Sequence, residues 1–293
     1  MTLATLLVLC RFLHFSAVML IFGCSLFTLF LSPQRTSPLV NRHFYPLQRI
    51  AVWVSAFTAV LMLAVQAGLM GDGWGDTWRP TIWWAVLGTT FGKAWCWQLL
   101  FSFLTLLVLL LQAAKRGPAL MLCALLLLLN LAFVGHAVMH SGALGMLHRI
   151  NHAVHLLAVG YWFGSLVPLL ICLRYLPQPQ WHKDVVTSLI RFSRWGHGAV
   201  ILVIITGVSN SLIILGHWPR EMNSAYQGLL LLKIALVALM VLVALANRYA
   251  IVPAMRARPK LAQSGLVTGC WLQLILGASV LWLVSLLGTY SPV

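Results

Sequence analysis

The chain has 293 residues, of which 61% are hydrophobic and only 8% are charged, and its mean hydropathy is +0.94. This composition excludes an ordinary soluble globular protein and is typical of a chain that crosses a membrane several times. The net charge of +15 does not indicate nucleic acid binding, because most of the cations lie between apolar segments, where their positions report topology.

We predict an all-α, polytopic bundle of eight transmembrane helices that forms one integral membrane domain over residues 1–293. A helix needs about 20 mostly apolar residues to cross a bilayer. Eight such runs follow one another, separated by breaks such as "SPQRTSP" and "KRGP". The predicted helices span 4–31, 48–70, 93–113, 118–139, 148–175, 188–215, 227–251 and 264–288.

The connections between these helices alternate in charge. The first, third, fifth and seventh hold most of the Lys and Arg residues and a single acid, Asp184, whereas the other three acids lie in the second and sixth. Because cytoplasmic connections carry the excess of cations, both termini are expected to face outward. The tryptophans between 74 and 97 then fit an aromatic belt at the outer interface.

The first predicted helix carries two residues that are costly in a membrane, Arg11 and His14. Shifting the chain by 141 residues places "HFSAVMLIFG" (14–23) on "HLLAVGYWFG" (155–164). The shift predicts two four-helix repeats, about 1–140 and 141–293, which run in parallel because four is an even number. His14 and His155 would then form a symmetric pair below the outer surface. The alternative is a repeat kept for packing, with each imidazole bonded to nearby backbone.

A second group of histidines is expected at the outer face. "HAVMH" ends the fourth predicted helix and places His136, Met139 and His140 on one face, while "HRINHAVH" places His148, His152 and His155 on one face of the fifth. Imidazole and thioether are ligands that suit copper, and no Asp or Glu lies in any predicted span. These residues predict a metal site, to which His217, Met146 and Met222 could add ligands. Taken singly, each is also explained as a polar tip or a packing residue.

Four cations near the outer face leave a second reading open: Arg11, Lys93, Arg149 and Lys233. Cations repel a metal ion but suit an anionic group, such as the propionates of a b-type haem with His14 and His155 as axial ligands and Arg11 beside it. The chain would then act in electron transfer to copper or to a periplasmic partner. Snorkelling towards lipid headgroups also explains such cations.

The chain resembles the copper resistance protein D family of bacterial inner-membrane proteins. The resemblance rests on "HLLAVGYWFGSL", "RFSRWGHGAVILVIITGVSNS", the eight-helix layout and the outer histidines. It implies copper homeostasis, with uptake into the cytoplasm and a separate periplasmic copper-binding partner. Copper would be received at His136, Met139, His140, His148 and His152 and passed to His14 and His155. A non-transporting docking module is a further alternative, and no nucleotide motif supports ATP-driven pumping.

Overall fold

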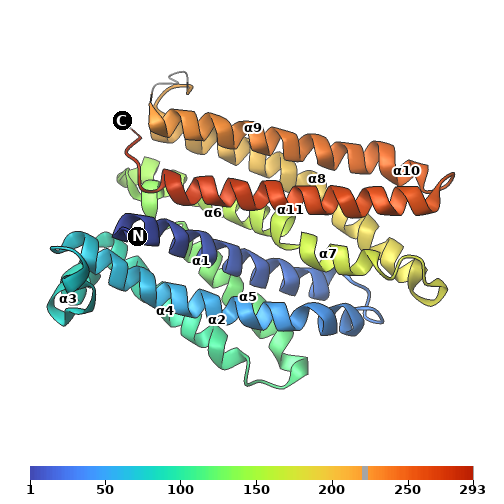
Figure 1. The fold of residues 1–293 in the computed structure, drawn as a ribbon, viewed down its shortest axis with the longest axis horizontal. Coiled ribbons are helices and arrows are strands. Elements are labelled where there is room, and N and C mark those ends of the chain that lie inside the picture. The colour runs from blue at the N-terminus through green and yellow to red at the C-terminus, as the bar shows by residue number, and fades with distance from the viewer. Residues whose placement is uncertain (220–223, 293) are drawn as a thin grey trace.

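The computed structural model describes residues 1–219 and 224–292, and within these ranges the chain is helical with no β-strand. The long helices lie side by side along one axis, with both termini at the same end (Figure 1). This confirms the all-α prediction. The long helices are α1 (Leu3–Leu26), α2 (Ser37–Met70), α4 (Thr90–Val108), α5 (Ala113–Leu131), α6 (Gly142–Gly164), α8 (Pro179–Leu215), α9 (Ala225–Ala246) and α11 (Pro259–Leu287).

Shorter helical segments extend or connect the long helices. They are η1 (Phe27–Leu31), η2 (Trp74–Trp78), α3 (Pro80–Gly88), η3 (Gly135–Val138), α7 (Leu166–Leu173), η4 (Asn247–Ile251) and α10 (Val252–Ala254). The tryptophans of this region divide into two kinds: Trp84 on α3 is 74% exposed, whereas Trp95 on α4 is fully buried and donates a hydrogen bond to the Ala59 carbonyl. Trp95 therefore belongs to the core and not to an interfacial belt.

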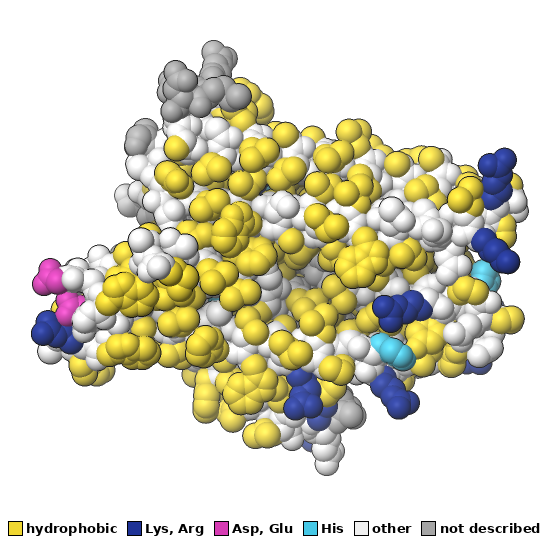
Figure 2. All heavy atoms as spheres, viewed as in Figure 1, with side chains coloured by type: hydrophobic (Ala, Val, Ile, Leu, Met, Phe, Trp, Pro, Cys, Tyr) yellow, Lys and Arg dark blue, Asp and Glu magenta, His cyan; other side chains and the backbone are white. Residues whose placement is uncertain are grey.

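The surface of the bundle fits a membrane. Among the described residues, seven helical segments are long and apolar enough to cross one. Figure 2 shows an apolar surface, with the visible acids at the end that carries the termini and most of the visible cations towards the other end. The predicted span that is not among these seven is the fourth, 118–139, which overlaps α5, a helix of 19 residues; the count of eight stays a prediction.

Several helices have boundaries other than those predicted. α2 begins at Ser37 rather than 48, with a proline in its first turn, and α8 begins at Pro179 rather than 188 for the same reason. Both additions are polar amphipathic turns that lack the apolar run used to place a span. At its other end α5 stops at Leu131, well before the predicted 139.

The N-terminal and C-terminal groups of helices meet where α1 crosses α6. α1 packs on α2 and α5, α6 packs on α8, and α1 also packs directly on α6. At the crossing, a Cβ added to Gly23 would overlap the backbone of Gly164, and one added to Gly164 would overlap the Met19 carbonyl. Ser165, which follows α6, donates a hydrogen bond of 3.4 Å to the Gly23 carbonyl. These glycines correspond under the 141-residue shift, as the predicted repeat requires, and the repeat itself stays a prediction.

Candidate functional site

The predicted stripe of His136, Met139 and His140 on one helix face is wrong. α5 ends at Leu131, His136 lies in the separate turn η3, and His140 lies in irregular backbone between η3 and α6. The helix cannot continue because Val134 is extended and Gly135 adopts a positive φ of 75°. The residues remain neighbours of α6 through this turn and not through a shared helical face.

The second predicted stripe does lie on one helix. His148, His152 and His155 follow one another along α6 at helical spacing. The turn before them is tight because Gly142 adopts a positive φ of 64°. Gly145 then lies so close to the chain before the turn that a Cβ would overlap the His140 carbonyl. This close approach brings the backbone of His140 against the first turn of α6.

His140 and His148 form a pair at the start of α6. Their ring centroids are 5.9 Å apart, and His148 is only 1% exposed. The Nδ1 atoms of both rings are buried and have no hydrogen-bond partner in the described part of the chain. A buried polar atom without a partner is unfavourable, and here two such nitrogens lie on adjacent rings.

His136 and Met139 lie at the border of this pair. His136 donates from Nε2 to the Tyr290 carbonyl, 3.3 Å away, and its ring centroid is 5.6 Å from that of Tyr226. Burial lowers the pKa of the His136 imidazole, the Tyr290 carbonyl partly reverses the shift, and the Arg11 guanidinium lowers the pKa further. The neutral form, which is the form that binds metal, is therefore favoured. Met139 is 47% exposed.

His152 and His155 form a second pair one turn deeper. Their rings lie nearly parallel with centroids 6.3 Å apart. Asn210 on α8 donates to His152 Nδ1 over 3.3 Å, and His155 Nδ1 donates to the Thr206 hydroxyl over 2.8 Å. Among the described residues no hydrogen bond engages His155 Nε2, so its lone pair is available.

His14 lies in a different environment, fully buried in the N-terminal helices. Its Nδ1 donates to the Ser55 carbonyl and the Thr58 hydroxyl, 3.1 and 3.0 Å away, and its Nε2 accepts from the Gln98 amide over 2.9 Å. Asn130 in turn donates to the Gln98 oxygen over 2.7 Å. Both ring nitrogens of His14 are thus engaged in a buried polar network.

His14 and His155 share one local arrangement although they are not joined. Each donates from Nδ1 to a threonine hydroxyl, on α2 for His14 and on α8 for His155, and both hydroxyls donate to the carbonyl four residues earlier. Within the described ranges, no hydrogen bond or ring contact links the two imidazoles. Each ring is held by the helices of its own half.

The remaining predicted residues are not gathered at one centre. Arg11 donates to the Gly288 carbonyl over 3.2 Å and stands 5.6 Å from the centre of the Phe15 ring. His217 hydrogen-bonds the Trp218 carbonyl, Met146 is 61% exposed, and Met222 lies outside the described residues. In the part of the chain that the structure describes, no three His, Cys, Asp or Glu side chains form a ready metal site.

Sequence patterns did not point to the polar partners of the histidines. Thr58, Gln98 and Asn130 surround His14, and Thr206 and Asn210 surround the deeper pair on α6. A buried amide in an apolar helix is itself a signal, because it must find a partner there. That signal identifies Gln98 and Asn130 as network members but does not say which side chain they bind.

Comparison with known proteins gives the family. Residues 1–146 match the model of the copper resistance protein D-like N-terminal domain, and residues 186–287 match that of copper resistance protein D. The chain is 41% identical to the inner membrane protein YebZ of Escherichia coli K12 over 96% of its own length and 97% of the relative's. The chain belongs to the copper resistance protein D family. It is a multi-pass inner membrane protein.

Two further relatives in this comparison carry copper in their names. Copper resistance protein D of Pseudomonas syringae pv. tomato is 30% identical over 96% of the chain and 95% of the relative. The copper transport protein CutJ of Bacillus subtilis 168 is 27% identical over 78% of the chain but only 44% of the longer relative. No solved structure matches the chain. The family association is therefore with copper, as the resemblance implied.

The network around His14 predicts a measurable loss of stability. Changing Gln98 to Leu removes the donor to His14 Nε2 and the acceptor of Asn130 while both groups stay buried. We expect the free energy of unfolding to fall by about 1–3 kcal/mol. A lower melting temperature of the purified protein in detergent would report this. The matched change at exposed Gln34 should leave the melting temperature unaltered, and equal melting of both variants would contradict a structural role for the network.

Proposed function

We propose that this protein receives copper at its outer face and moves it inward, as a copper uptake protein of the inner membrane. The receiving group comprises His140 and His148, with His136, Met139 and His152 beside them. The proposal is supported by the copper resistance family and by the copper transport name of one relative. Copper is the cargo, and imidazole and thioether are ligands that suit it.

The observation that carries the proposal is the pair of unpartnered nitrogens on His140 and His148. Their rings are adjacent, and both Nδ1 atoms are buried without a hydrogen bond. A neutral imidazole nitrogen without a proton is a metal ligand. Two of these, with the exposed thioether of Met139 on the preceding residue, offer a soft, uncharged ligand set that a metal ion can enter from the surface.

From this pair the histidines of α6 lead inward. His152 and His155 follow His148 on the same helix, about 6 and 10 Å further along its axis at 1.5 Å per residue. His155 keeps a free Nε2, and Thr206 holds its ring by Nδ1. Such a second-shell hydrogen bond fixes the tautomer and orients a metal-ligating histidine. We therefore assign the inward step to His155.

His14 enters the route only if Gln98 moves. Its Nδ1 is held by Thr58 in the same way as His155 is held by Thr206, but its Nε2 is covered by the Gln98 amide. Rotation of the Gln98 side chain would expose the lone pair. We propose His14 as the partner of His155 in the second of two parallel repeats, about 1–140 and 141–293, with Gln98 as its cover.

A haem-binding role has less support than copper handling. A bis-histidine haem needs one free nitrogen on each axial ligand, and His14 would offer Nε2 only after the same movement of Gln98 that the copper route requires, so the preference for copper rests on the family association. Arg11, the predicted partner of a propionate, donates to the Gly288 carbonyl instead. Copper handling therefore remains the proposal, with copper delivered by a separate periplasmic copper-binding protein.

Cuprous ion binding by the purified protein tests the receiving pair. Changing His140 and His148 together to Ala removes both unpartnered nitrogens, and we expect the affinity for Cu(I) to fall at least tenfold. Competition with a chromogenic Cu(I) chelator under anaerobic conditions measures this. His43, which lies on α2 at the opposite end of the bundle, supplies the matched control, His43→Ala. An unchanged affinity in the double variant would refute the assignment of the site.

A further inference from the structure

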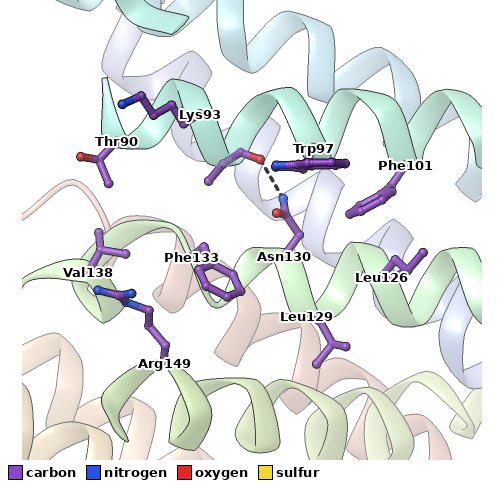
Figure 3. Close-up of a pocket in the computed structure, with 11 residues that line it drawn as sticks. Thr90, Lys93, Trp97, Phe101, Leu126, Leu129, Asn130, Phe133, Val138 and Arg149 are labelled. Carbon is purple, nitrogen blue, oxygen red and sulfur yellow. Dashed lines mark hydrogen bonds between the residues drawn. The ribbon is translucent and has the colours of Figure 1, made fainter. Parts of the chain in front are cut away.

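A cavity of about 530 Å³ opens between α4, α5 and the start of α6. None of the paired histidines lines it, although its lining residue Arg149 follows His148 in the chain, and the proposed copper ligands do not account for it. Figure 3 shows Lys93 and Arg149 at one end of this cavity and Phe101 and Leu126 at the other. The charged end is the one that carries the chain termini, since Lys93 lies in the first turn of α4 and Arg149 near the beginning of α6.

The walls of the cavity follow one face of each helix. On α4 the lining residues Lys93, Trp97 and Phe101 are spaced by four, which places them one above another. Trp97 is 56% exposed and stacks on Phe101, with ring centroids 5.8 Å apart. From Lys93 to Phe101 the groove runs about 12 Å along the helix, from a charged mouth to an aromatic and aliphatic wall.

The two cations at the mouth lack an acidic partner. The Nε atom of Arg149 is buried and has no hydrogen bond, and within the described residues no ion pair or side-chain hydrogen bond engages Lys93. The chain has only four acids, and none of the described ones lines the cavity. A buried guanidinium nitrogen without a partner is unfavourable, and an anion held between the two cations would satisfy it.

We propose that this cavity binds a phospholipid of net negative charge from the outer leaflet of the membrane. The phosphate lies between Lys93 and Arg149, and an acyl chain lies along Trp97, Phe101 and Leu126. This orientation follows from the bilayer, because the headgroup must lie at the interface and the chain must point to the membrane centre. Arginine suits a phosphate because its planar group donates two parallel hydrogen bonds.

Lipid retention by the full-length protein, measured by native mass spectrometry without copper, tests this site. The probes are phosphatidylglycerol and phosphatidylcholine with identical acyl chains. We expect the wild type to retain phosphatidylglycerol preferentially, and Lys93→Gln with Arg149→Gln to lower that preference roughly tenfold or more. The control pair Arg256→Gln and Lys260→Gln removes two exposed cations elsewhere and should keep the preference. Equal retention of both lipids by the wild type, or an unchanged preference in the first double variant, would overturn the proposal.

Two further experiments identify the chemical class of the ligand. Leu126→Trp, which fills the apolar wall, should lower the retention of both lipids, since it blocks the acyl chain rather than the headgroup. Inorganic phosphate at the same concentration should not displace phosphatidylglycerol, and displacement would assign the site to free phosphate instead. The melting temperature of each variant separates loss of the site from loss of the fold. Copper binding is not needed in any of these measurements, so the result is independent of the function proposed above.

Discussion

Replacing Gly23 or Gly164 by Ala should cause a large loss of stability. At both positions the added Cβ would overlap backbone atoms of the opposite helix, which cannot rotate aside as a side chain could. α1 and α6 would have to separate, and with them the two groups of helices that pack on either side. We expect destabilisation of about 3 kcal/mol or more and a melting temperature lower by at least about 5 °C.

The control for this change is Gly196→Ala on α8, where a Cβ would meet no atom within 4 Å. Alanine generally stabilises a helix relative to glycine, so this variant should melt at the wild-type temperature or slightly above it. Thermal unfolding of the three purified variants in the same detergent gives the comparison. If Gly23→Ala and Gly164→Ala melt like Gly196→Ala, the helices do not cross at these residues.

Replacing His14 and His155 together by Ala should abolish copper accumulation that depends on this protein. The two imidazoles occupy corresponding positions on α1 and α6, and each is oriented by a threonine hydroxyl. Without them the proposed route has no imidazole ligand beyond His152 on α6. Cellular copper, measured in a strain that lacks its own copy of the gene, should fall to the level of the empty strain, with the variant present in the membrane in normal amount. Normal accumulation would count heavily against copper uptake through these residues.

Single changes then separate a ligand from a structural residue. His155→Ala alone should lower accumulation strongly, because its Nε2 is free to bind metal. Gln98→Leu uncovers His14 Nε2, so it should lower the melting temperature but preserve accumulation per amount of protein in the membrane if His14 is a ligand. A fall in accumulation beyond the loss of protein would restrict His14 to a structural role. His197→Ala on α8 is the control, since His197 bonds the Ser193 carbonyl and the Tyr249 hydroxyl far from this route.

The fold class could be predicted because membrane spans are local features of the sequence. An uninterrupted apolar run must form a helix in a bilayer, where every backbone polar group has to be bonded within the chain. The predictions were less accurate where a helix leaves the membrane. α2 and α8 extend into polar turns with a proline in the first turn, and α5 stops before Gly135, which adopts a positive φ. A hydropathy profile reveals neither a polar extension of a helix nor its early end.

The candidate site was predicted in part. The stripe of His148, His152 and His155 depended only on helical spacing, which α6 preserves. The predicted stripe of His136 and His140 required a helix that extends to residue 139. Because α5 ends at Leu131, these two residues do not share a helix face. The partners of His14 could not be foreseen, because Gln98 and Asn130 come from α4 and α5 and meet it only through packing.

The sequence alone determined that this chain is an all-α membrane protein with histidines concentrated near one end, because composition and helical period act over a few residues at a time. The tertiary structure decided which imidazole nitrogens are covered and which are free. It left the Nδ1 atoms of His140 and His148 without partners and placed Gln98 on His14. Those outcomes depend on the packing of α4, α5 and α6 against α1, whose contacts join residues far apart in the chain.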